Sequence, residues 1–122
     1  MAELQQRLQA LSEEYQKAEQ ELQQHIQSRQ RLEAQLQENK QVKKEFSGLD
    51  DDANIYKLVG PVLLKQDRKE SMLAVDGRLE FIDKEIKRFE KQIKEAQEKS
   101  DKLKMEIIQV QSQAQPEQGA QA

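Results

Sequence analysis

The sequence contains no cysteine and no tryptophan, only two prolines and four glycines, and aromatic residues make up just 4% of its 122 residues. Without cysteine there can be no disulfide framework and no thiolate metal site, which agrees with a reducing compartment. The low mean hydropathy of −1.02 argues against a single thick hydrophobic core. The length fits one domain, and the abundance of Gln, Glu, Lys, Leu and Ala favours long helices.

Two further absences narrow the classes of partner. No apolar run approaches the roughly 20 residues that span a bilayer, and we expect no signal peptide and no membrane partner. The formal net charge is −3, and the 20 basic residues are interspersed among 23 acidic ones. Because many phosphates are neutralised only by dense positive charge, nucleic acid is not an expected partner.

The sequence also lacks the residue groups that carry catalysis. Its single histidine, His25, has no cysteine or convergent carboxylates around it, so it is a poor metal ligand. The four glycines are far apart and form no phosphate-binding loop, and no serine has a neighbouring base to activate it. The carboxylates follow solvated helix faces near basic residues, as surface ion pairs do. We therefore expect no enzyme, no cofactor and no metal.

The first part of the chain carries a heptad pattern. Apolar residues recur at alternating spacings of four and three: Leu4, Leu8, Leu11, Tyr15, Ala18, Leu22, Leu32, Leu36 and Phe46. A repeat held for about six heptads predicts a coiled-coil helix over about residues 2–47, ending near Gly48. The pattern is interrupted by four polar residues: His25, Arg29, Asn39 and Lys43. These polar residues either fix the register of the helix pair or mark places where the helices splay.

A second helix is predicted over about residues 68–112. Asp67 and Glu70 have the spacing of a capping box at its start. Its apolar positions are Met72, Val75, Leu79, Ile82, Ile86, Phe89, Ile93, Ala96, Leu103, Ile107 and Val110, with Ser100 as the one polar interruption. Residues 113–122 have no periodicity and are predicted to be a disordered tail.

Between the helices lies an apolar segment with a different pattern, Ile55 to Asp67. Gly60-Pro61 is a turn signal, so we predict one β-hairpin over about residues 55–65. Alternation places Ile55 and Val59 on one face and Tyr56 and Leu58 on the other. Two apolar faces on two strands need other chains to cover them. The predicted fold class is mainly α: a long antiparallel two-helix coiled coil joined by one short β-hairpin, in a single domain over residues 1–112.

At the far ends of the two helices, Met105 and Ile108 lie off the heptad pattern. With their neighbours they form a set that we call the tip residues: Leu4, Leu8, Leu11, Leu103, Met105, Ile107, Ile108 and Val110. These residues either form an adaptable apolar contact surface or close the end of the coiled coil. The sequence pattern leaves both possibilities open.

The apolar segment and the first half of the second helix resemble a known family. The run Ile55-Tyr56-Lys57-Leu58-Val59-Gly60-Pro61-Val62-Leu63-Leu64-Lys65-Gln66-Asp67 is succeeded by Val75, by Arg78-Leu79-Glu80-Phe81-Ile82 and by Glu85-Ile86-Lys87-Arg88-Phe89-Glu90. This sequence is similar to the β-type subunits of prefoldin, strongly from Ile55 to Glu90 and only in composition over the first helix. Ser71 departs from the pattern, because the family usually has alanine there.

The resemblance implies an ATP-independent molecular chaperone of the cytoplasm. A β-type subunit contributes one hairpin to a hetero-hexamer, so the partners would be two α-type and three further β-type subunits. Clients would be unfolded proteins such as actin and tubulin, which are passed to the cytosolic chaperonin. The tip residues would contact these clients. Subunit assembly would use seven hairpin residues: Ile55, Tyr56, Leu58, Val59, Val62, Leu63 and Leu64.

Two other functions remain alternatives at this point. A structural coiled-coil scaffold protein would self-associate through its hairpin, and its stoichiometry would be that of a symmetric homo-oligomer. A nucleic-acid-binding helical arm would show a steep dependence of binding on salt, although the net charge of −3 opposes it.

Overall fold

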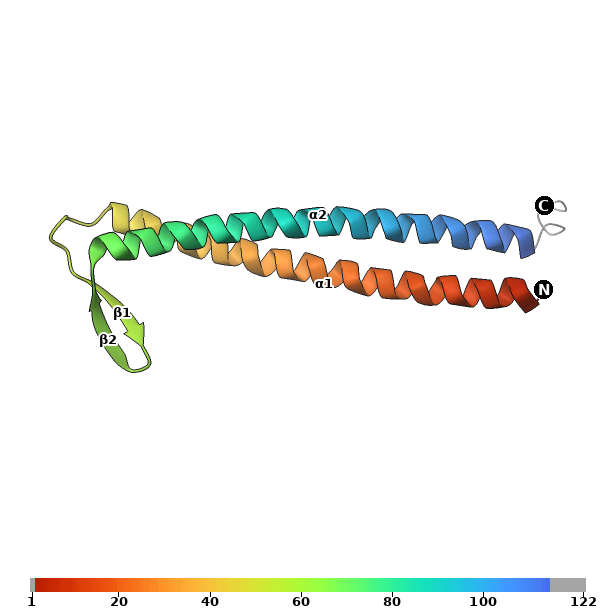
Figure 1. Cartoon of the computed structure of the whole chain (residues 1–122), viewed down its shortest axis with the longest axis horizontal. Helices are drawn as coiled ribbons and strands as arrows, with labels where there is room; N and C mark the ends of the chain where they lie inside the picture. The colour runs from red at the N-terminus through yellow and green to blue at the C-terminus, as the bar shows by residue number, and fades with distance from the viewer. Residues whose placement is uncertain (1, 115–122) are drawn as a thin grey trace. The chain divides into compact units, whose positions relative to one another are not determined.

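The computed structural model describes residues 2–114. Two long helices, α1 (Ala2–Ser47) and α2 (Arg68–Ala114), are joined by an antiparallel hairpin of β1 (Ile55–Val59) and β2 (Val62–Gln66) (Figure 1). The predicted fold class is confirmed. Of the tail predicted for residues 113–122, Gln113 and Ala114 are the last residues of α2, and the rest lies outside the described residues. Neither described helix is long and apolar enough to cross a membrane.

The hairpin closes through a two-residue turn. Val59 pairs with Val62, so Gly60 and Pro61 are the two central residues of the turn. Gly60 has a φ of 57°, and it is the only residue with positive φ between residues 2 and 114. A positive φ at the first central position is the geometry of a type II′ turn, which suits the twist of two paired strands and favours glycine. Proline then fits the second position with its fixed negative φ.

Groups just outside the two helices satisfy part of the helix ends next to the hairpin. At the start of α2, the Glu70 backbone N–H donates to the Asp67 carboxylate at 3.1 Å, so Asp67 is the N-cap as predicted. At the end of α1, the backbone N–H of Gly48 donates to the Lys44 and Glu45 carbonyls. Gly48 does not take the left-handed conformation that commonly closes a helix. Carbonyls at and just beyond the end of α1 accept from another donor, the Arg68 side chain.

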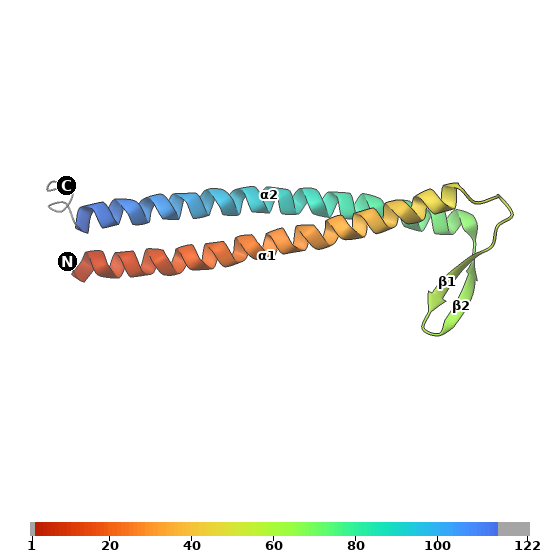
Figure 2. The same ribbon diagram turned by 180° about the vertical axis from the view of Figure 1, so that it is seen from behind.

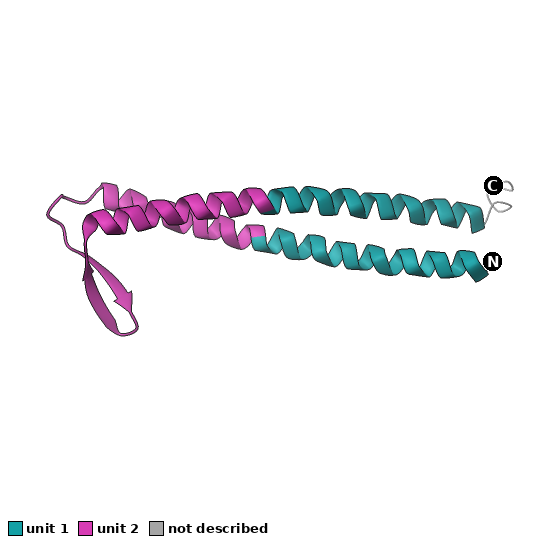
Figure 3. Ribbon diagram, in the orientation of Figure 1, with its two compact units in different colours: residues 1–28, 89–122 teal, residues 29–88 magenta. Residues whose placement is uncertain are grey.

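The chain forms two compact units, which Figure 3 shows in different colours. The first contains residues 1–28 and 89–122, where part of α1 packs against part of α2. Its core is the cluster of Leu11, Ala18, Leu103 and Val110, with Leu4, Leu8, Tyr15 and Ile107 packed around it. The predicted polar interruption at Ser100 is buried, and its hydroxyl donates to the Glu19 carboxylate. The seam in this unit therefore follows the heptad pattern.

The second unit contains residues 29–88 and includes the hairpin. Its buried residues are Ile55, Val75, Ile82 and Ile86. None of the residues that α1 contributes to this unit is buried. The polar seam position Lys43 instead forms an ion pair with Asp76 of α2 at 2.9 Å. At this seam position a polar contact between the helices takes the place of an apolar one.

Candidate functional site

The hairpin exposes apolar side chains on both of its faces. It projects to one side of the part of the helix pair that belongs to its own unit (Figure 2). Leu58 pairs with Leu63 across one face, and Val59 pairs with Val62 across the other. Six of the seven predicted assembly residues are 48–68% exposed, and we call these six the hairpin surface: Tyr56, Leu58, Val59, Val62, Leu63 and Leu64. Exposed apolar residues gathered on one small hairpin make it a candidate interaction site.

The seventh predicted assembly residue, Ile55, is buried within the chain itself. It lies at the root of β1 and lines a groove of about 480 Å³ between the hairpin and the helices. Val42 and Phe46 of α1 and Val75 of α2 line the same groove. Ile55 therefore anchors the hairpin to its own helices, whereas the other six residues keep about half or more of their surface exposed.

The tip residues divide into two groups. Leu11, Leu103 and Val110 are buried, and Leu4, Leu8 and Ile107 are partly buried against them. Met105 and Ile108 are 72% and 53% exposed, respectively. Only these two tip residues offer most of their apolar surface to a partner while the helix pair stays closed.

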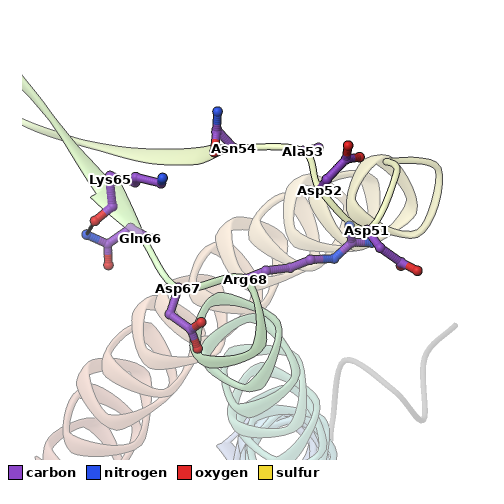
Figure 4. A pocket seen from close by; sticks show the side chains of 8 residues that line it. All are labelled: Asp51, Asp52, Ala53, Asn54, Lys65, Gln66, Asp67 and Arg68. Carbon is purple, nitrogen blue, oxygen red and sulfur yellow. Dashed lines mark hydrogen bonds between the residues drawn. The ribbon is translucent and has the colours of Figure 1, made fainter.

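A polar hollow of about 460 Å³ lies beside the loop that comes after α1, and Figure 4 shows the residues that line it. The carboxylates of Asp51, Asp52 and Asp67 point in different directions there and do not converge (Figure 4). No group of three or more possible metal ligands occurs among residues 2–114. The hollow therefore offers no arrangement for metal or acid–base chemistry.

One ion pair on α2 shifts the pKa of its acidic member. The Arg88 guanidinium donates to both carboxylate oxygens of Glu85, at 2.6 Å for the shortest contact. These hydrogen bonds favour the charged carboxylate and lower the pKa of Glu85. The two residues lie three positions apart on α2, so the pair stabilises the helix locally.

Sequence reasoning missed two features near the hairpin. The Arg68 side chain extends from the start of α2 toward the loop (Figure 4) and donates to the carbonyls of Phe46, Leu49 and Asp50. Leu73 and Phe81 of α2 are large apolar residues that point to solvent. Their positions off the heptad pattern could have revealed them, but no sequence pattern indicates the contacts of Arg68.

Comparisons with known proteins agree with this geometry. Residues 2–114 match the family model described as "Prefoldin subunit". Prefoldin subunit 6 of Saccharomyces cerevisiae is 45% identical over 98 residues, which cover 80% of this chain and 86% of the relative. Prefoldin subunit 6 of Homo sapiens is 42% identical over 123 residues, which cover 100% of this chain and 95% of the relative.

A solved structure agrees on the fold. The crystal structure of the prefoldin beta subunit from Thermococcus strain KS-1 superposes with a TM-score of 0.75 at 28% identity. The superposition covers 83% of this chain and 89% of that one. From the family match, the two relatives and the shared helix–hairpin–helix fold together, the chain belongs to the prefoldin subunit family, as a β-type member homologous to prefoldin subunit 6.

Proposed function

We propose that the chain is one of six subunits of a hetero-hexameric prefoldin that holds unfolded proteins without using ATP. Its partners are two α-type and three further β-type subunits, and the complex works in the cytoplasm. Its clients include nascent actin and tubulin, which it delivers to the cytosolic chaperonin. The family match over residues 2–114 carries this proposal. Members of the family are non-enzymatic chaperone subunits, in agreement with the expectation that the chain is not an enzyme.

The hairpin surface supports the assembly part of the proposal. A single two-stranded hairpin is only marginally stable in water. Six exposed apolar residues on its two faces add a strong drive to become covered. Hairpins from neighbouring subunits cover both faces at once if they join into closed β-barrels. Sheet closure also removes the unpaired strand edges, which would otherwise template aggregation.

The tip residues support the holding part of the proposal. Met105 is flexible and polarisable, and Ile108 beside it adds branched apolar surface. Two exposed side chains give only weak contact with an unfolded chain. Several subunits that act on one client raise the effective concentration for each later contact, so avidity replaces a tight single site. Weak separate contacts also allow the client to be released without nucleotide hydrolysis.

Native mass spectrometry of the tagged chain, recovered from its own cells, tests the assembly. We expect one complex of six different subunits that stays intact when nucleotide is removed. A symmetric homo-oligomer, or a complex with unrelated proteins, would contradict the proposal and favour a coiled-coil scaffold instead.

The double substitution Met105→Glu with Ile108→Glu is expected to weaken client holding and leave assembly unchanged. Both side chains are exposed, so the new charges face solvent and do not disturb the core around Val110. We expect the hexamer concentration that half-suppresses aggregation of denatured actin to rise at least about threefold. The effect is limited because the other subunits still contact the client through their own helix ends. Light scattering of the diluted actin measures this.

The matched control is Gln109→Glu with Gln111→Glu, which adds the same two charges to the same turns of α2 at exposed polar positions. It should hold actin as the unmodified complex does. Equal holding by both double variants would remove Met105 and Ile108 from the client contact.

A further inference from the structure

An apolar stripe runs along the outer side of α2 near the hairpin. Leu73 and Phe81 are 64% and 61% exposed, and Gly77 lies midway between them. Residues four apart lie on the same side of a helix, so the three form one continuous strip that we call the α2 stripe. The buried positions Val75 and Ile82 belong to a different face of α2. The core of the chain's own unit therefore does not explain these exposed residues.

Gly77 makes the stripe more informative than two exposed apolar residues alone. A glycine inside a helix destabilises it by about 0.5–1 kcal/mol relative to alanine. A Cβ added at Gly77 would meet no atom within 4 Å, so nothing in the chain itself requires the missing side chain. One physical use of a helical glycine is the close approach of another backbone. Gly77 leaves room for such an approach in the notch between the larger side chains of Leu73 and Phe81.

The stripe adjoins the groove beside the hairpin surface. The groove of about 480 Å³ is lined by Tyr56 and Leu58 of the hairpin and by Ala74 and Arg78 of α2. Arg78 is one residue after Gly77 and three residues before Phe81, so the groove edge adjoins the stripe. A molecule that covers the exposed faces of Tyr56 and Leu58 thus reaches the stripe across the groove edge at Arg78.

We propose that the α2 stripe is a second part of the subunit interface, and that a neighbouring prefoldin subunit occupies it. The neighbour places apolar side chains on Leu73 and Phe81, and its backbone approaches Gly77 closely. The exposed guanidinium of Arg78 at the groove edge matches a carboxylate of that neighbour. This inference rests on the proposed assembly through the hairpin and extends the interface from the hairpin onto α2.

Two variants of the full chain, co-expressed with the other prefoldin subunits of its own cell, test the inference. Leu73→Glu with Phe81→Glu places charges on both ends of the stripe, and both positions are exposed in the single chain. We expect its share of complete hexamers, measured by native mass spectrometry in competition with the unmodified chain, to fall at least about tenfold. The control Gln5→Glu with Gln20→Glu adds two charges at exposed positions of α1 and should compete equally.

Gly77→Gln separates the stability of the single chain from its ability to assemble. Glutamine is a better helix former than glycine, so the helix content and the melting temperature of the single chain should rise. The new side chain fills the notch, so the share of the variant in complete hexamers should fall at least about threefold in the same competition. A more stable chain that assembles less well points directly to a partner at Gly77.

Three outcomes overturn the inference. If both stripe variants compete equally while Leu63→Asp is excluded, the hairpin interface stands and the stripe is not part of it. If the stripe variants and Leu63→Asp all compete equally, the proposed assembly through the hairpin fails as well. If the stripe variants assemble fully but hold denatured actin less well, the occupant of the stripe is a client and not a subunit.

Discussion

Replacing Leu63 with Asp is expected to exclude the chain from prefoldin hexamers and leave its own helices folded. Leu63 is exposed in the single chain and pairs with Leu58 across one apolar face of the hairpin. In the single chain the new carboxylate therefore stays in water. In the proposed assembly the same face is covered, and burying an unpaired carboxylate costs several kcal/mol. A loss of about 3 kcal/mol lowers the affinity for neighbouring subunits about 100-fold.

Co-purification with the other subunits measures this effect, and circular dichroism of the single chain checks that the helices persist. Leu63→Ala removes apolar area without adding a charge, so it should give an intermediate loss. Gln20→Glu adds one negative charge at an exposed position of α1 and should assemble normally. Recovery of Leu63→Asp in complete hexamers at normal yield would show that this face of the hairpin is not covered by another subunit.

Much of the fold could be predicted because it depends on local patterns. Alternating spacings of three and four residues specify a buried helix face directly, and Gly60 specifies the only position with positive φ among residues 2–114. Polar contacts between the two helices are harder to predict from such local patterns. Lys43 interrupts the heptad pattern, but its ion pair with Asp76 depends on how the two helices are aligned. A single sequence contains no direct record of that alignment.

At the tip, the heptad pattern separates the inner residues from the outer ones. Met105, Ile107 and Ile108 are close in sequence and similarly apolar, but the heptad pattern places only Ile107 on the inner face. Ile107 packs against the cluster that contains Val110, whereas Met105 and Ile108 stay exposed. Helical rotation by one residue, about 100°, separates an inner position from an outer one. The proposed client contact therefore depends on two of the eight tip residues while the helix pair is closed.

Arg68→Ala is expected to loosen the connection between α1 and the hairpin by about 2 kcal/mol. The Arg68 guanidinium donates to the carbonyls of Phe46 at 3.3 Å and Leu49 at 3.1 Å, and also to that of Asp50. These carbonyls lie at or just beyond the end of α1, where helical partners run out. A positive charge is unfavourable in the first turn of a helix, where Arg68 lies in α2. The cross-segment contacts account for arginine at this position.

Hydrogen exchange of the full chain measures the effect locally, because the amides of residues 46–54 report the opening of this connection. For Arg68→Ala we expect these amides to exchange about 30-fold faster, which corresponds to about 2 kcal/mol. Arg68→Lys keeps the charge, but an ammonium group cannot reproduce the planar guanidinium that donates to three carbonyls. Most of the increase in exchange rate should therefore remain. Lys84→Ala removes an exposed ion pair with Glu80 on the same helix and should change exchange in residues 46–54 very little. If Arg68→Lys exchanged at the normal rate, charge alone would hold the end of α1, and the three-carbonyl geometry would not be required.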